Sequence, residues 1–453
     1  MSDVEVTGAT PPPVADEPGS LASSAGLLLG AQIIGNVGYF VAVLLLARAL
    51  GPTDRGQVAF ITVTAMVTAR VASLGINEST CVFAAQRPER RPVLLTNLLL
   101  AVAGFSVAGA AIVCGALLAA PEVRPPGIEG RQLAVLAAAT LATALVTAGY
   151  SYLQGCSRFR PYGLVQSTAS WFYAVMLAVT WAVSDLTATS AAIIWVISQT
   201  LPGLVLAREC RRGIGMARPS LVLLRESWRF GVRAWIGGLS HFLNARTDQI
   251  LTALLASEAT LGIYAVAVNA SEVLFYLPSA VAAALLPAVA RESPGAEGRT
   301  LPVFRAVTLL TAAAVAVAAL AGPVLVPVVF GDVYRGSVDP FLWLVPSAFG
   351  FAASATFSSA LVASNAPGLS SLGPLVALVL GLALDLVLIP AHGAAGAAAA
   401  ASVALLAGGA AAAAAYRSQT GFRWSELVPR ARDLRTLRLL ARRALRARTP
   451  APS

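Results

Sequence analysis

The chain has 453 residues, of which 57% are hydrophobic and only 12% are charged, and its mean hydropathy is +0.74. Soluble domains carry about 25% charged residues, so this composition excludes an ordinary soluble globule and predicts a polytopic membrane protein. The formal net charge is +10, and all 32 basic residues are Arg. Because the chain has no Lys, it cannot contain a Walker A phosphate loop or a Schiff-base lysine.

In chain order, residues 1–20 are acidic and rich in Pro, which predicts a disordered N-terminus. Apolar stretches of about 20 residues, the length that crosses a bilayer, then occur twelve times. The predicted fold is therefore all-α, with about twelve transmembrane helices in two six-helix bundles, 21–207 and 231–416. The twelve predicted spans are 21–47, 57–85, 93–120, 132–153, 163–184, 187–207, 231–256, 259–290, 301–330, 338–364, 368–390 and 393–416.

The Arg residues orient these spans in the membrane. With a cytoplasmic N-terminus, the predicted inner loops and the tail hold 24 Arg, whereas the outer loops hold five, namely Arg48, Arg55, Arg124, Arg131 and Arg335. The positive-inside rule therefore predicts a plasma-membrane protein with both termini in the cytoplasm. The tail, 417–453, has Arg and apolar residues at helical spacing, which predicts a basic amphipathic segment on the anionic inner leaflet rather than a nucleic-acid-binding tail.

Connecting loops are short throughout the chain. The longest is the predicted cytoplasmic linker, 208–230, which is too short for a folded catalytic domain. The two His and four Cys are scattered, so no metal site is expected. We therefore predict that the chain is not an enzyme and holds no cofactor.

The two halves of the chain show weak self-similarity at an offset of about 206 residues. The turn at 47–60 corresponds to the turn at 252–266, and each restarts a helix with Gly-x-x-Ala, at Gly56–Ala59 and at Gly262–Ala265. A second pair of links, 153–163 and 361–369, has nearly the same offset. Six spans per half is an even number, so this pattern predicts a parallel internal repeat, with a substrate site between the halves.

Three segments carry a family resemblance. They are LLARALGPTDRGQVAFITVTAMVTARVASLGINEST (45–80), QGCSRFRPYG (154–163) and ALDLVLIPAHGAAGAAAAASVA (383–404), where Asp385 stands in place of the usual Asn. In order and spacing they resemble the bacterial polysaccharide flippases of the multidrug/oligosaccharidyl-lipid/polysaccharide exporter superfamily. The resemblance implies a transporter that moves polyprenyl-diphosphate-linked oligosaccharide from the inner to the outer leaflet by alternating access. It also implies polysaccharide polymerase or export partners, and coupling to an H⁺ gradient, an Na⁺ gradient or the membrane potential.

Ionisable residues within spans are costly, so each is a candidate site residue. Arg offers a permanent charge and a planar fork for phosphate oxygens. The candidates for a cavity that holds the substrate diphosphate are Arg70, Ser73, Asn77, Arg233, Asn244 and Arg246. Ser73 and Asn77 follow Arg70 on one face of an ideal helix. Arg233 and Asn244 share a stripe on the seventh span, whereas Arg246 faces away from Arg233 unless that helix is bent.

The candidates for ion coupling are Asp248, Glu272, Asp385 and His241, whose imidazole could titrate near neutral pH. Structural roles compete with these assignments. Arg233 can reach the interface, Arg246 and Asp248 can pair with neighbours, and Glu78 can meet Arg87 at the inner end. Two other functions stay open, a drug/cation antiporter of the same superfamily and a relative of the lipid II flippases.

Overall fold

The computed structural model of the protein describes residues 18–122, 124–212, 217–279, 281, 300–364 and 366–429. Its helices are α1 (Pro18–Ala49), α2 (Pro52–Ala72), α3 (Ile76–Gln86), α4 (Arg91–Ala119), α5 (Gly130–Gly155), α6 (Phe159–Val183), α7 (Ala188–Arg211), α8 (Leu221–Asn244), α9 (Thr247–Leu255), α10 (Glu258–Glu272), α12 (Thr300–Phe330), α13 (Val338–Leu344), α14 (Ser347–Ala363), α15 (Pro367–Ser370) and α16 (Leu372–Thr420). Short 3₁₀ turns lie at Pro88–Arg90, Val273–Phe275, Asp332–Ser337 and Trp424–Leu427. The described residues include no strand, so the predicted all-α class is confirmed.

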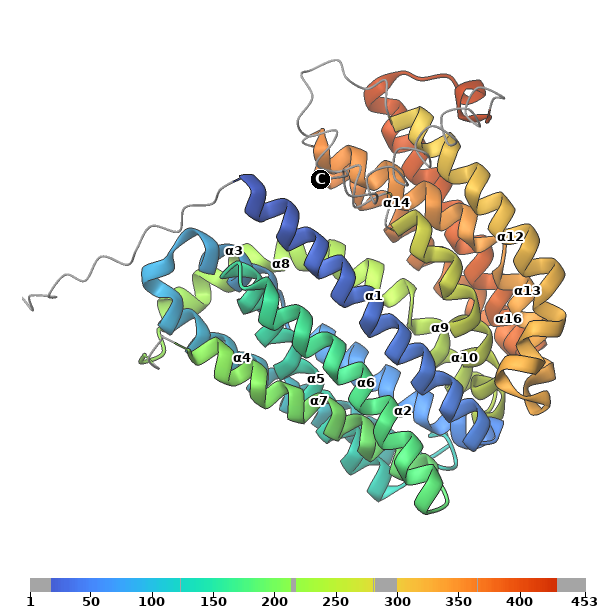
Figure 1. Ribbon diagram of the computed structural model, residues 1–453, viewed down its shortest axis with the longest axis horizontal. Coiled ribbons are helices and arrows are strands. Elements are labelled where there is room, and N and C mark those ends of the chain that lie inside the picture. The colour runs from blue at the N-terminus through green and yellow to red at the C-terminus, as the bar shows by residue number, and fades with distance from the viewer. Residues whose placement is uncertain are drawn as a thin grey trace, which may run out of the picture.

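Figure 1 shows two bundles, α1–α7 on one side and α9, α10 and α12–α16 on the other. By length and composition, seven described helices can cross a membrane, or up to nine if each bent pair is one span. The bent pairs are α2 with α3, at 56°, and the segment 332–344 with α14, at 48°. At 1.5 Å per residue the 49-residue α16 would be about 74 Å long, more than twice a bilayer core. A non-helical Gly393 divides it into two segments, at the boundary between the last two predicted spans.

The helix bounds repeat between the two halves. The first residues of α2 and α10 are 206 positions apart, and so are the last residues of α1 and α9. The start of α7 has its counterpart directly after the break at Gly393, again 206 positions later. The predicted parallel repeat is therefore confirmed in the described helices.

The repeat also governs how α2 and α10 pack. A Cβ atom on Gly56 would lie 1.8 Å from the carbonyl oxygen of Glu258, and one on Gly262 would lie 1.9 Å from that of Pro52. Each glycine thus faces the first residue of the other helix, and both pairs are related by the offset of 206. Small residues that let two backbones approach are typical of membrane helix crossings. We call this contact the glycine crossing.

Other contacts join the two halves at the same end, which the Arg distribution predicts to be the outer one. The carboxylate of Glu258 accepts hydrogen bonds from Gln57 Nε2 (2.9 Å) and from the backbone N–H of Gly127 (2.8 Å). Arg48 donates to the carbonyls of Val328 and Val329 at the end of α12, where the helix dipole favours a cation. These contacts and the glycine crossing close the predicted outer end.

Helix α8 differs from a simple membrane span. It begins at Leu221, inside the predicted linker, and Figure 1 shows it running from beside α3 toward α9. Gly231 packs against Gly75, with backbone atoms so close that a Cβ on either residue would meet the other chain segment at 1.9–2.3 Å. The predicted seventh span, 231–256, is therefore not one helix, because α8 ends at Asn244 and α9 starts at Thr247.

Candidate functional site

A cavity of about 250 Å³ lies between the two halves. Its walls come from α1, α2, α5, α6 and α7 of the first half and from the start of α9 and the end of α10 in the second. Amide and hydroxyl groups dominate the polar part of the lining, with four aromatic side chains and two guanidinium groups. These residues are Thr62, Gln166, Ser170, Ser198, Gln199, Gln249 and Asn269, then Tyr39, Tyr150, Tyr173 and Trp195, and Arg55 and Arg246.

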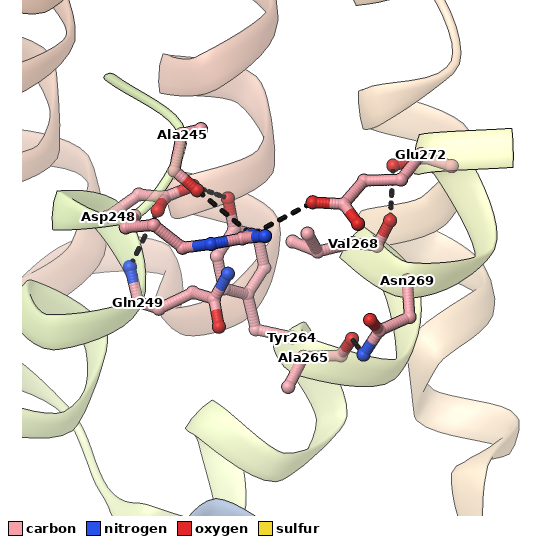
Figure 2. A network of polar contacts seen from close by, with 10 residues as sticks. Ala245, Asp248, Gln249, Tyr264, Ala265, Val268, Asn269 and Glu272 are labelled. Carbon is pink, nitrogen blue, oxygen red and sulfur yellow. Dashed lines mark hydrogen bonds and ion pairs between the residues drawn. The ribbon is translucent and has the colours of Figure 1, made fainter. Parts of the chain in front are cut away.

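Arg246 reaches this cavity because the seventh predicted span is broken. The residue is the N-cap of α9, with a non-helical φ of −138°, and its side chain turns toward α10. Arg246 Nη1 donates to the carbonyl of Ala245 at 3.2 Å and to Glu272 Oε1 at 2.8 Å. Figure 2 shows Ala245 and Asp248 on one side of this network and Glu272 and Asn269 on the other. The structure therefore joins a predicted cargo residue and a predicted ion-coupling residue in one ion pair.

Asp248 lies beside this pair but is buried. The hydroxyl of Tyr264 donates to its Oδ2 at 2.5 Å, and the backbone N–H of Gln249 donates to its Oδ1 at 2.7 Å. Asp385, on α16, is also buried, lies within electrostatic range of Asp248, and has no hydrogen-bond partner at Oδ1. Three of the four predicted ion-coupling residues therefore lie in one region of the second half. They are Asp248, Glu272 and Asp385.

Arg70 does not line the cavity. Its Nη2 lies 2.7 Å from Glu78 Oε1, so the two residues form an ion pair across the bend between α2 and α3. Leu74 (φ 44°) and Gly75 (φ 84°) make that bend. The carbonyl of Arg70, freed by it, accepts hydrogen bonds from Ser73 Oγ (2.8 Å) and Trp235 Nε1 (3.0 Å).

The bend also separates the residues of the predicted polar face. Ser73 and Asn77 are buried on either side of it and do not line the cavity. The prediction of one cavity-facing stripe on a straight helix is therefore wrong. The expected contact of Glu78 with Arg87 is wrong as well, because Arg87 pairs with Glu226 at 2.7 Å.

The remaining predicted residues belong to α8. Asn244 is its last residue, and its Oδ1 faces Gly381 on α16 rather than the cavity. The side chains of Arg233 and His241 lie outside the described residues. Because α8 ends at Asn244, Arg246 does not lie on the helix that carries Arg233 and Asn244. The basic tail beyond residue 429 and residues 1–17 also lie outside the described residues.

Arg55 is the site residue that sequence reasoning missed. It was expected in an outer loop, but Pro52 occupies the first turn of α2, so the helix includes Arg55. The side chain lines the cavity and is only 4% exposed, and its buried Nε has no hydrogen-bond partner. Among the residues that the structure describes, no carboxylate forms an ion pair with it. The Pro at N1 was the signal that would have placed the helix start earlier.

Comparisons with known proteins agree with this architecture. The sequence profile of a family described as polysaccharide biosynthesis protein matches residues 45–339. No curated protein matches the sequence.

Three solved structures share the fold. One is lipid II flippase MurJ in an inward closed conformation, with TM-score 0.73, 11% identity, and coverage of 88% of this chain and 89% of that one. Another is an inward-facing multidrug resistance MATE family transporter of the MOP superfamily, with TM-score 0.63, 14% identity, and coverage of 87% and 98%. A eukaryotic MATE transporter has TM-score 0.60, 16% identity, and coverage of 89% and 96%.

Proposed function

The chain belongs to the family of polysaccharide biosynthesis proteins, and from this premise we propose that it moves a polyprenyl-diphosphate-linked oligosaccharide from the inner to the outer leaflet. It is a multi-pass membrane protein with the fold of known flippases and transporters. The proposal places it in the bacterial cytoplasmic membrane, with both termini and the Arg-rich tail on the cytoplasmic side. Polysaccharide polymerase or export proteins are its proposed partners.

The observation that carries the proposal is the lining of the cavity between the halves. Amides, hydroxyls and aromatic rings outnumber charges there, and this combination suits sugar rings, which present hydroxyls at their edges and apolar faces to aromatic side chains. Both cations that line it are Arg, and no carboxylate does. A lipid diphosphate carries negative charge, and a guanidinium can bind two of its oxygens at once.

The cavity also extends toward the end of the bundles that the Arg distribution predicts to be cytoplasmic. It extends to Tyr150 and Gln166, near the ends of α5 and α6 that lie opposite the closed predicted outer end. A headgroup that enters from the inner leaflet would therefore meet the polar lining, while the polyprenyl chain stays in lipid.

Ion coupling is proposed for the second half. Glu272 holds Arg246, and the buried Asp248 and Asp385 lie close by. If H⁺ or Na⁺ neutralises this acidic region, the charge balance at Arg246 changes, which links an ion gradient to the cargo site. No residue in this scheme requires a bound cofactor.

The test is deletion of the gene in the native host, followed by assay of the lipid-linked glycan and of its leaflet. Accumulation at the inner leaflet with loss of surface polymer, restored by the intact gene, is the expected result. Arg246→Gln should fail to restore export, whereas Arg335→Gln should restore it, because Arg335 is exposed and pairs with the exposed Asp332. Unchanged glycan together with new sensitivity to cationic dyes would instead identify a drug/cation antiporter.

A further inference from the structure

The two cations of the cavity differ in their charge balance. Arg246 is paired with Glu272 at 2.8 Å, whereas Arg55 has no carboxylate partner among the described residues. The Nε of Arg55 is buried without a hydrogen-bond partner, which is unfavourable because burial removes its hydration. The uncompensated positive charge of the cavity therefore lies at Arg55.

A second unsatisfied group lines the same cavity. The hydroxyl of Tyr173, on α6, is buried without a hydrogen-bond partner, lines the same cavity, and lies within electrostatic range of Arg55. Buried polar groups in native proteins are nearly always satisfied. A guanidinium N–H and a phenol O–H that both lack an acceptor are groups that can donate hydrogen bonds to an oxyanion.

Arg55 lies near the closed end of the cavity, and Arg246 lies deeper in the membrane. Arg55 is in the first turn of α2, next to Gly56 of the glycine crossing. Arg246 precedes the nine residues of α9, which run to that same end and are about 13 Å long. The two guanidiniums therefore meet different parts of an elongated cargo.

Taken with the proposed function, on which this inference rests, these observations indicate which part of the cargo reaches Arg55. A lipid-linked glycan that enters from the inner side brings its sugars to the closed end first, and its diphosphate follows. We propose that Arg55 and Tyr173 form a subsite for an acidic substituent, a carboxylate, on the glycan. The cargo class is then an acidic oligosaccharide, and Arg55 is a specificity-determining residue.

The experiment measures binding to the purified full-length protein by calorimetry. The probes are trigalacturonate, its neutral counterpart galactotriose, and inorganic pyrophosphate. Wild type should bind trigalacturonate more tightly than galactotriose. Arg55→Gln should weaken trigalacturonate binding about 10- to 100-fold, the effect of losing one charged hydrogen bond, and leave galactotriose binding unchanged. Arg335→Gln removes an exposed charge at the same end and should change neither affinity.

Tyr173→Phe provides a second variant in case Arg55→Gln does not fold, and it should weaken trigalacturonate binding selectively by several-fold. Equal losses for the acidic and the neutral sugar would mean that these residues only shape the cavity, and would overturn the proposal. A loss confined to pyrophosphate would assign the oxyanion to the lipid carrier and overturn the sugar assignment.

Results with wild type alone separate the two proposals. Equal affinity for acidic and neutral sugar, or no binding of trigalacturonate, refutes the acidic subsite while leaving the flippase proposal in place if the leaflet assay supports it. Binding of cationic dyes with no binding of any sugar refutes the flippase proposal itself.

Discussion

The glycine crossing makes a prediction about the closed end. In Gly262→Ala, the new Cβ would lie 1.9 Å from the carbonyl oxygen of Pro52, where an ordinary contact needs at least 3.4 Å. The neighbouring atom belongs to the backbone, so it cannot rotate away, and α2 and α10 must separate by about 1.5 Å. Overpacking of this kind costs about 1–3 kcal/mol.

That energy acts only on the state in which the two helices cross. A conformation that opens the predicted outer end relieves the contact, so the ratio of closed to open molecules should fall roughly 5- to 150-fold. The measurement is the distance between spin labels at Glu122→Cys and Val333→Cys, both exposed at this end on opposite halves, with the four native cysteines replaced by Ser. Gly262→Ala should show a longer distance population.

Gly115→Ala is the matched control. This glycine lies in α4 with nothing within 4 Å of an added Cβ, so the distances between the spin labels should not change. The stability of the helix should increase by about 0.5–1 kcal/mol, because Ala loses less conformational entropy on folding than Gly. A folded Gly262→Ala protein with the wild-type distance distribution would refute the assignment of the glycine crossing as the contact that keeps this end closed.

Three further predictions concern individual contacts. Gly75→Ala should lower the free energy of unfolding by about 3 kcal/mol or more, because Gly75 has φ 84° and its Cβ would meet the Gly231 backbone at 2.3 Å; thermal unfolding beside Gly104→Ala, where space is open, checks this. A double-mutant cycle with Arg246→Gln and Glu272→Gln should give a coupling energy of about 1–2 kcal/mol, since both side chains are only about a quarter exposed, and zero coupling would contradict the ion pair. The hydrogen bond from Arg87 lowers the pKa of Glu226, which lies outside the predicted spans. This pair therefore stabilises the fold above the ordinary Glu pKa of about 4.3 and loses its effect as pH falls through the lower folded value. The stability difference between wild type and Glu226→Gln should be constant from about pH 6 to 8 and decline as pH falls below about 4.3, and a difference that grows in acid would contradict it.

Most of the helical framework could be predicted from the sequence, because hydropathy and the length of a span are local properties. The repeat was also predictable, since its offset is visible at Gly56 and Gly262. What failed was the extrapolation of helical faces across breaks. Leu74 and Gly75 adopt positive φ. The helix also breaks at Ala245–Arg246, where the sequence has no Pro or Gly that would predict a break. Gly75 packs against Gly231 of α8, a contact between segments far apart in the sequence that no local pattern encodes.

The sequence predicted which ionisable residues are site candidates, but it did not predict which of them form ion pairs. Every carboxylate in the second-half region was a candidate, yet the partner of Glu272 depends on how Arg246 turns at the start of α9. Arg55 was missed for a simpler reason, an error of a few residues at a helix start. In a chain with so few charged residues, such an error moves a cation from a solvated loop into the cavity wall.

The repeat itself explains how the two halves can differ in chemistry. The backbone follows the 206-residue offset, but the ionisable residues do not. Arg55 corresponds to Leu261, whereas Asp248 and Asp385 correspond to Ala42 and Val179. Among the described residues, the cavity cation without an acidic partner, Arg55, therefore lies in the first half, and the buried acids Asp248 and Asp385 lie in the second. In the proposed transport cycle the two pseudo-symmetric bundles move against each other, so an anionic cargo held mainly by the first and a cation held by the second would each bias the same movement. The proposed cargo and ion sites are thus coupled through the relative position of the halves, with Arg246 and Glu272 as the point where they meet.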